Sequence, residues 1–197
     1  MIYYKGFIIL YGGITNKGFD DENFYRYSTE NRQWKTITIS GIKPGPRAFH
    51  SIGFFKPDIL IIFGGKYKNS DNLQDFAIGN DLFYLDITTN DSSTPFVANV
   101  GPTPRYGHAS SYNSNFSPIH EHIIVGGLDK TFCAFEVFIL KEIELNSDKK
   151  WVYEQKKLKT TNIDNNDDVF ETAKKTIINC KRELEQLSIK SIEVNKK

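Results

Sequence analysis

Ile59-Leu-Ile-Ile-Phe-Gly-Gly65 is an apolar strand that closes on a pair of glycines, and this short pattern decides the fold. Two further copies are Phe7-Ile-Ile-Leu-Tyr-Gly-Gly13 and His122-Ile-Ile-Val-Gly-Gly127. They recur at intervals of about 50 to 60 residues, a period typical of repeat proteins whose single unit cannot bury its own faces. A short, continuously apolar run predicts a strand that is buried on both faces. The chain is therefore expected to stack several copies of one β unit.

The composition is that of an ordinary globular protein. The 197 residues are 39% hydrophobic and 25% charged, with a net charge of +1, so nothing favours nucleic acid or an anionic membrane as a partner. No apolar run approaches the roughly 20 residues that span a bilayer. Cys133 and Cys180 lie in unlike contexts and form no disulfide framework, which favours a reducing, cytoplasmic location.

Each copy is predicted to form four strands. In the second copy these are residues 47–55, 59–63, 81–89 and, as the outer strand, 96–100. The third copy repeats the order at 105–112, 122–125, 135–140 and 151–154, and the first copy ends with strands at 23–27 and 34–39. The paired glycines suit a point where a strand leaves a crowded centre, because they add little volume and tolerate sharp turns.

Eight residues define the repeat. They are Gly12, Gly13, Gly64, Gly65, Gly126, Gly127, Trp34 and Trp151. The two tryptophans fall on predicted outer strands, where a large ring can pack against the next unit. Phe96 occupies that place in the second copy.

A second motif, Pro-x-Pro-Arg-x-x-His, leads into the second and third copies. Arg47 is followed by His50, and Arg105 is followed by His108. Recurrence at the same place in the repeat indicates a shared role, such as hydrogen bonding between adjacent units. The alternative is contact with a partner, in which the arginines would meet an acidic group.

Together, the strand with its glycine pair, the downstream aromatic strand and Pro-x-Pro-Arg-x-x-His resemble the kelch repeat family over about residues 1–155. The resemblance implies an all-β fold, a kelch-type β-propeller segment of about three four-stranded blades. These blades would cover about residues 1–40, 47–100 and 105–155, within a repeat region of 1–157. It also implies a non-catalytic module that binds a protein partner, with loops 14–22, 66–80 and 128–131 on the binding face.

Three repeats would form an incomplete ring, because propellers typically have four to eight blades. Met1 aligns with Gly53, so the first copy lacks the Arg-x-x-His half of its inner strand. We expect either a fragment of a longer kelch protein or a homodimer in which two copies complete a six-bladed ring.

The tail, residues 158–197, is predicted to be a polar linker followed by an amphipathic α-helix. Apolar residues recur there at spacings of three and four: Phe170, Ala173, Ile177, Cys180, Leu184 and Leu187. This helix could pack on the propeller. Alternatively, it could begin a coiled coil in a self-associating scaffold or polarity-type protein.

The sequence predicts no catalytic, cofactor or metal site. His120 and His122 would share one face of a strand, but no third ligand is evident nearby. The resembling family includes copper radical oxidases of the galactose oxidase type, whose ligand set cannot be recognised in this chain. We therefore expect no enzyme, and a remnant of such an oxidase is a further alternative.

Overall fold

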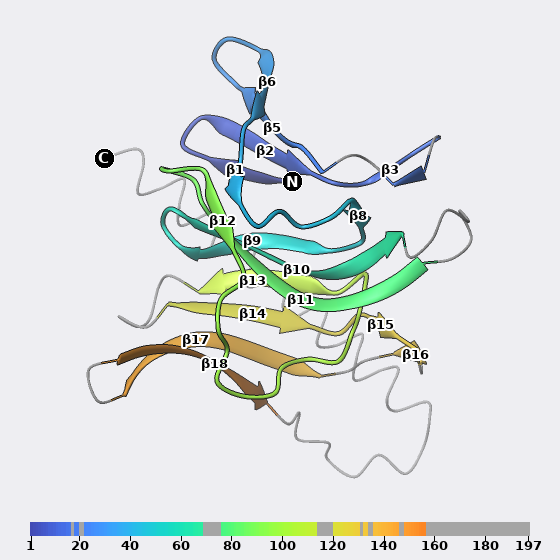
Figure 1. Cartoon of the computed structure of the whole chain (residues 1–197), viewed down its shortest axis with the longest axis vertical. Coiled ribbons are helices and arrows are strands. Elements are labelled where there is room, and N and C mark those ends of the chain that lie inside the picture. The colour runs from blue at the N-terminus through green and yellow to red at the C-terminus, as the bar shows by residue number, and fades with distance from the viewer. Residues whose placement is uncertain are drawn as a thin grey trace, which may run out of the picture. The chain divides into compact units, whose positions relative to one another are not determined.

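The computed structural model describes residues 1–16, 18–19, 22–68, 76–113, 120–130, 132–133, 136–145 and 148–156. All of them belong to one compact unit, Met1–Lys157. A second unit, Leu158–Lys197, lies outside the described residues, and so does the predicted C-terminal helix. The described part of the chain is all-β, as predicted, and three main sheets follow one another in sequence order (Figure 1).

The first main sheet holds four antiparallel strands in the order β1-β2-β5-β6. Their bounds are β1 Ile2–Tyr4, β2 Phe7–Tyr11, β5 Phe24–Ser28 and β6 Gln33–Ile37. Between β2 and β5, directly after the glycine pair, a short hairpin forms from β3 (Ile14–Thr15) and β4 (Gly18–Phe19).

The second main sheet is built around the long pair β10 and β11. Its strands are β7 Ser40–Gly41, β8 Arg47–Ala48, β9 Ser51–Lys56, β10 Ile59–Lys68, β11 Phe76–Asp86 and β12 Asp91–Ser93. β8 and β9 both pair with β10, whose register shifts between Phe63 and Gly65. The glycine pair thus lies inside β10, and the strand continues beyond it.

The third main sheet repeats the four-stranded order as β13-β14-β17-β18. Its strands are β13 Ala109–Asn113, β14 Glu121–Val125, β17 Val137–Leu145 and β18 Asp148–Lys156. A second short hairpin, β15 (Leu128–Asp129) with β16 (Phe132–Cys133), follows this glycine pair, just as β3–β4 follows the first.

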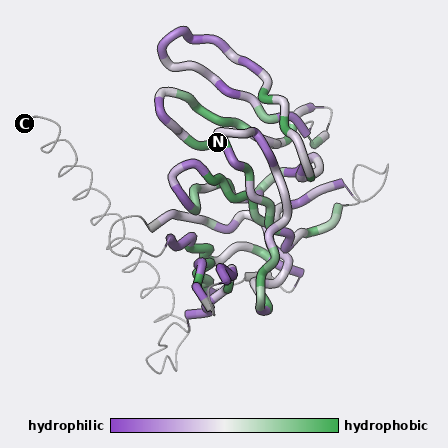
Figure 2. Tube along the Cα trace, turned by 60° about the vertical axis from the view of Figure 1, so that its left-hand side comes forward, coloured by the Kyte–Doolittle hydropathy of each residue, from purple (hydrophilic) through white to green (hydrophobic). Residues whose placement is uncertain are grey.

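Two apolar cores lie between successive main sheets. The first contains Ile9, Tyr11 and Phe24 from one sheet and Leu60, Ile62, Phe83 and Leu85 from the next. The second contains Ile61, Phe63 and Leu82 together with Ile124, Phe138, Leu140 and Tyr153. Successive residues of β10 serve opposite cores because side chains alternate along a strand. Each fully buried Ile, Leu or Phe contributes about 1.5–3 kcal/mol. Figure 2 shows these apolar stretches along the strands, with hydrophilic residues toward the turns.

The segments between main sheets run along the outer edge of the sheet that they enter. β7 pairs in parallel with β12, and Val97 forms a parallel bridge with Trp151 of β18. The prediction of an outer strand at 96–100 in the second copy is therefore wrong. β12 holds that place, although its sequence, Asp-Ser-Ser, lacks the apolar signal of a strand.

The strand registers also separate the two tryptophans. Counted from the glycine pairs, Trp34 of β6 has the position of Ser92 in β12 and of Tyr153 in β18. Trp151 lies two residues earlier along β18, where its ring packs against Phe55 at a centroid distance of 4.4 Å. The prediction that Trp34 and Trp151 occupy equivalent positions of the repeat is therefore wrong.

Candidate functional site

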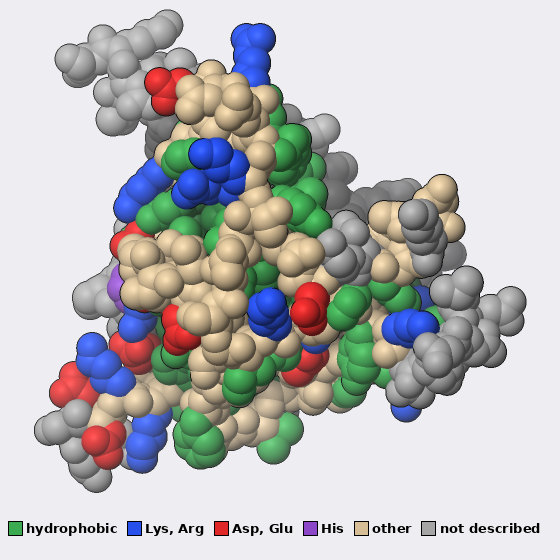
Figure 3. Space-filling view, turned by 45° about the horizontal axis from the view of Figure 1, so that its top comes forward, with side chains coloured by type: hydrophobic (Ala, Val, Ile, Leu, Met, Phe, Trp, Pro, Cys, Tyr) green, Lys and Arg blue, Asp and Glu red, His purple; other side chains and the backbone are tan. Residues whose placement is uncertain are grey.

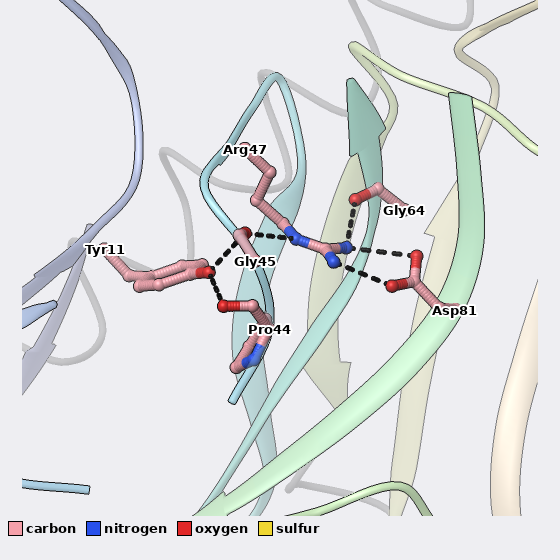
Figure 4. A network of polar contacts seen from close by, with 6 residues as sticks. All are labelled: Tyr11, Pro44, Gly45, Arg47, Gly64 and Asp81. Atoms are coloured by element: carbon pink, nitrogen blue, oxygen red, sulfur yellow. Dashed lines mark hydrogen bonds and ion pairs between the residues drawn. The ribbon is translucent and has the colours of Figure 1, made fainter. Parts of the chain in front are cut away.

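The Arg47 side chain connects two strands within its own sheet (Figure 4). It is 3% exposed, and its Nη1 donates to the carbonyl of Gly64 at 3.0 Å. Nη1 and Nη2 also contact the two carboxylate oxygens of Asp81 at 3.0 and 2.7 Å. This two-pronged geometry is the strong form of an arginine–carboxylate pair.

Arg105 repeats this arrangement in the third sheet. It is fully buried, and it donates to the carbonyl of Gly126 at 3.0 Å and to Glu136 at 2.6 Å. Asp81 and Glu136 each directly precede the residue that pairs with the end of the apolar run before the glycines. The two ion pairs therefore occupy the same place in the repeat.

The backbone of each arginine reaches back to the preceding sheet. Gly13 N–H donates to the carbonyl of Arg47, and Gly65 N–H donates to the carbonyl of Arg105, both at 2.9 Å. Each arginine therefore holds its own sheet through its side chain and the neighbouring sheet through its backbone.

His50 and His108 lie at the same two junctions. The ring of His50 packs edge-on against Tyr11 at 5.3 Å, and that of His108 against Phe63 at 5.2 Å. His108 Nε2 is 2.8 Å from Ser51 Oγ, a contact between sheets. Burial lowers the pKa of both rings to about 4, and the guanidinium group of the preceding arginine contributes to this shift.

We expect Arg105→Met to lower the free energy of unfolding by about 2–4 kcal/mol. Methionine keeps much of the apolar volume, but the Gly126 carbonyl and the Glu136 carboxylate lose their donor. Urea denaturation measures the change. The control is Arg26→Met, whose exposed guanidinium lies over the ring of Phe7 and should contribute less than about 1 kcal/mol. An equal, small change in both variants would contradict the prediction.

The strands and hairpins beyond the glycine pairs form a different surface, which lies on the right-hand side of Figure 1. We call Ile14, Phe49, Lys66 and Phe76 the loop-face patch. Ile14, Phe49 and Phe76 are 57%, 53% and 43% exposed. They line a groove of about 550 Å³ that Lys66 also borders.

Lys66 lies within an aromatic cluster of this patch. Its Nζ is 4.0 Å from the ring centroid of Phe76 and 3.9 Å from that of Tyr106. Cation–π contacts of this kind hold a lysine head group in place without neutralising it. Among the described residues, no carboxylate lies within ion-pair distance of Lys66.

Phe49 has an unusual backbone. Its φ is +58°, a left-handed conformation that is rare and strained for a bulky residue. The carbonyl of Phe49 accepts a hydrogen bond from Gly107 N–H at 2.8 Å, and its ring lies 6.2 Å from that of Tyr106. The backbone is therefore strained at a position where an aromatic ring is exposed to solvent.

The two remaining histidines bind groups of the protein itself. His122 Nδ1 is 3.0 Å from the carbonyl of Phe54, and His120 Nδ1 is 2.8 Å from the hydroxyl of Tyr112. Within the ranges that the structure describes, no three His, Cys, Asp or Glu side chains gather as a metal site would require. In the same ranges, no helix is long and apolar enough to cross a membrane.

Comparisons with known proteins agree with this architecture. The family model described as "KLHDC2/KLHL20/DRC7 Kelch-repeats domain" matches residues 1–170. Acyl-CoA-binding domain-containing protein 4 of Arabidopsis thaliana is 29% identical over 134 residues, which are 68% of this chain and 18% of that protein. The Rab9 effector protein with kelch motifs of Mus musculus is 32% identical over 81 residues, 41% of this chain and 20% of the relative. The chain thus matches about a fifth of the length of these relatives.

Proposed function

The chain belongs to the kelch-repeat family, and from this premise we propose that it is a non-catalytic protein-interaction module whose loop-face patch binds the partner. The exposed rings of Phe49 and Phe76 beside Lys66 are the observation that carries the proposal. Exposed apolar groups gathered in one place mark interaction sites, and loops on a rigid scaffold commonly carry recognition. One relative is named as an effector of Rab9, which is consistent with a protein partner.

In this proposal, the four residues of the two Arg-x-x-His motifs support the sheets and do not themselves bind the partner. Arg47, Arg105 and His108 are buried, and Arg47, Arg105, His50 and His108 contact groups of the protein itself. They would fix the sheets so that the loop-face patch keeps its shape. Direct contact between a partner and the buried side chains of Arg47, Arg105 and His108 would require local opening of the structure.

The three main sheets would be three blades of an open kelch propeller. Support comes from the four-stranded order of the first and third sheets, which β9-β10-β11-β12 repeats within the six-stranded second sheet, and from the equivalent arginine contacts at the two junctions. The linker and amphipathic helix at 158–197, and a cytoplasmic location, belong to the same proposal.

The partner should contact the loop-face patch with an apolar group and an acidic group. The apolar group would cover Phe49 and Phe76, and the acidic group would pair with Lys66. Its identity is to be established from the proteins that the intact chain retains from its own cells.

We expect the double variant Phe49→Ser/Phe76→Ser to bind its partner with an affinity at least about tenfold lower, since aromatic residues dominate interface energies. Quantitative affinity capture, followed by titration of the retained protein, measures the loss. Phe96→Ser is the matched control, because Phe96 is 79% exposed but lies on a linker outside the patch. If both variants bind the partner as well as the original chain does, the loop-face patch is not the binding site.

A further inference from the structure

The outer strand is covered in the second and third main sheets. On β12, Ser40 N–H donates to the carbonyl of Asn90 at 2.9 Å, and Ile42 N–H donates to that of Ser92 at 2.7 Å. On β18, Ala98 N–H donates to the carbonyl of Trp151 at 2.9 Å. In both sheets the covering segment runs parallel to the outer strand.

An asparagine extends the cover on β18. Asn99 Nδ2 donates to the carbonyl of Tyr153 at 2.7 Å, and its Oδ1 accepts from the N–H of Tyr153 at 2.8 Å. The side-chain amide thus takes the place of a further pair of ladder hydrogen bonds. The covering segment therefore binds the outward backbone groups of both Trp151 and Tyr153.

The first sheet offers the same groups without a cover from the described residues. By strand register, Arg32 and Trp34 occupy the places of Asn90 and Ser92 on β12, so their carbonyls point to the outer edge of β6. No strand of the described ranges pairs with that edge. Trp34 is 55% exposed, whereas Ser92 is 1% exposed.

The two ends of the stack also present apolar side chains. Tyr3, Ile8, Tyr27 and Trp34 lie opposite one another across the first sheet and so share the face that points away from the second sheet. Tyr3 is 64% exposed. Figure 3, with the top of Figure 1 turned forward, shows apolar side chains exposed between cationic ones.

The corresponding position on the third sheet is uncovered as well. Val125 precedes the third glycine pair and is 42% exposed. Tyr11 and Phe63 precede the first and second pairs, and they are 2% and 0% exposed because the next sheet covers them.

We propose that β6 binds, in parallel, the segment that follows β18 in a second copy of this chain. The spacing assigns the segment: β7 begins three residues after β6 ends, and the bridge at Val97 lies four residues after β12 ends. The same spacing after Lys156 selects residues 159–160 and their neighbours. One chain therefore carries both the donor segment and the acceptor edge.

Head-to-tail association satisfies both ends at once. It places the exposed face at Val125 of one copy against the face of Tyr3 and Trp34 of the other, which removes apolar surface from water. Two copies would together contribute six sheets, a number within the usual range of about four to eight blades in a closed propeller. This pairing is independent of the loop-face patch, so the proposed function does not depend on it.

Sedimentation velocity of the full chain over a concentration series tests the proposal. We expect a reversible species of twice the chain mass that Trp34→Pro abolishes, because proline removes the outward N–H of the edge strand. Trp34→Thr is the matched control, since it removes the ring but keeps the N–H. It should weaken the association by about tenfold or more without abolishing it. A chain ending at Lys157 should be monomeric.

Two results would overturn the proposal. One is a full chain that stays monomeric at all concentrations. The other is a dimer that survives Trp34→Pro. If that dimer is lost on removing 158–197, those residues hold it without the pairing at β6. Circular dichroism checks that each variant is folded.

Fluorescence provides a second measurement if Trp34→Pro fails to fold. Trp34 and Trp151 are the only tryptophans, so a Trp151→Phe chain reports on Trp34 alone. Its emission should move to shorter wavelength as the concentration rises and Trp34 becomes buried. Emission that does not change with concentration contradicts the pairing at β6.

Discussion

The protein is expected to lose stability as the pH falls from about 6.5 to about 4, because three histidines must then gain protons in buried sites. Burial lowers the pKa of His50, His108 and His122 to about 4, against an ordinary value of 6.5. Between these values the unfolded chain binds more protons than the folded one. The free energy of unfolding therefore falls as the pH falls, by up to about 1.4 kcal/mol per pH unit for each histidine. The contribution is fully present above pH 6.5.

Urea denaturation at several pH values between 4 and 7.5 measures this slope. Carboxylates with lowered pKa values, such as Glu154 with a pKa of about 2, begin to lose their contribution only below about pH 5, where the unfolded chain starts to bind protons at its acids. A loss of stability between about pH 6.5 and pH 5 therefore reports on the histidines. In the His122→Asn variant, the free energy of unfolding should fall less steeply with falling pH, by about the contribution of one histidine. The contribution is large because the ring of His122 has no exposed surface. A stability that stays constant from pH 7.5 to pH 4.5 would show that the histidines take up protons without separating the sheets.

The strands next to the glycine pairs could be predicted because their signal is local. Residues 59–63 are continuously apolar and lie at the centre of the second sheet, where both faces are covered. The Pro-x-Pro-Arg-x-x-His motif likewise marked the two junctions, since Arg47 and Arg105 have the same neighbours in each. Patterns of this kind depend on a few adjacent residues and on burial, both of which a sequence displays.

The outer edges could not be predicted in the same way. β12 consists of Asp91, Ser92 and Ser93, and backbone hydrogen bonds hold it in the sheet, so its side chains give no strand signal. Residues 96–100 are apolar enough to suggest a strand, yet Asn99 binds them to the backbone of the following sheet. Hydrogen bonds between backbone groups depend little on the type of side chain. For this reason β12 was missed and a strand was wrongly predicted at 96–100.

The carboxylates that pair with the arginines were also missed, although the sequence carries a signal for them. Asp81 in the second copy and Glu136 in the third stand directly before the residue that pairs with the end of the apolar run. The same position in the first copy is Asn23. Each of the two arginines thus has an acid at the same position of its repeat. This joint occurrence follows from the need of a buried guanidinium group for a negative partner.

We expect Gly64→Ala to be among the most damaging single substitutions in the described chain. Gly64 has a φ of +62°, and an added Cβ would lie 2.7 Å from the carbonyl oxygen of Arg105 in the next repeat. It would also lie 3.2 Å from His108 Cε1. The substitution thus strains the backbone and pushes apart the junction that Gly65 N–H and the Arg105 carbonyl hold together. The free energy of unfolding should fall by about 3 kcal/mol or more.

Gly107→Ala separates these two causes. Gly107 has nearly the same φ, +64°, but an added Cβ would have no neighbouring atom within 4 Å. Its cost should therefore be the backbone strain alone, about 1–2 kcal/mol. The difference between the two variants in urea denaturation gives the cost of the clash. If Gly64→Ala destabilises no more than Gly107→Ala, the glycine is needed only for its backbone conformation. The close approach of successive repeats would then tolerate a methyl group, because the neighbouring Arg105 segment can shift to accommodate it.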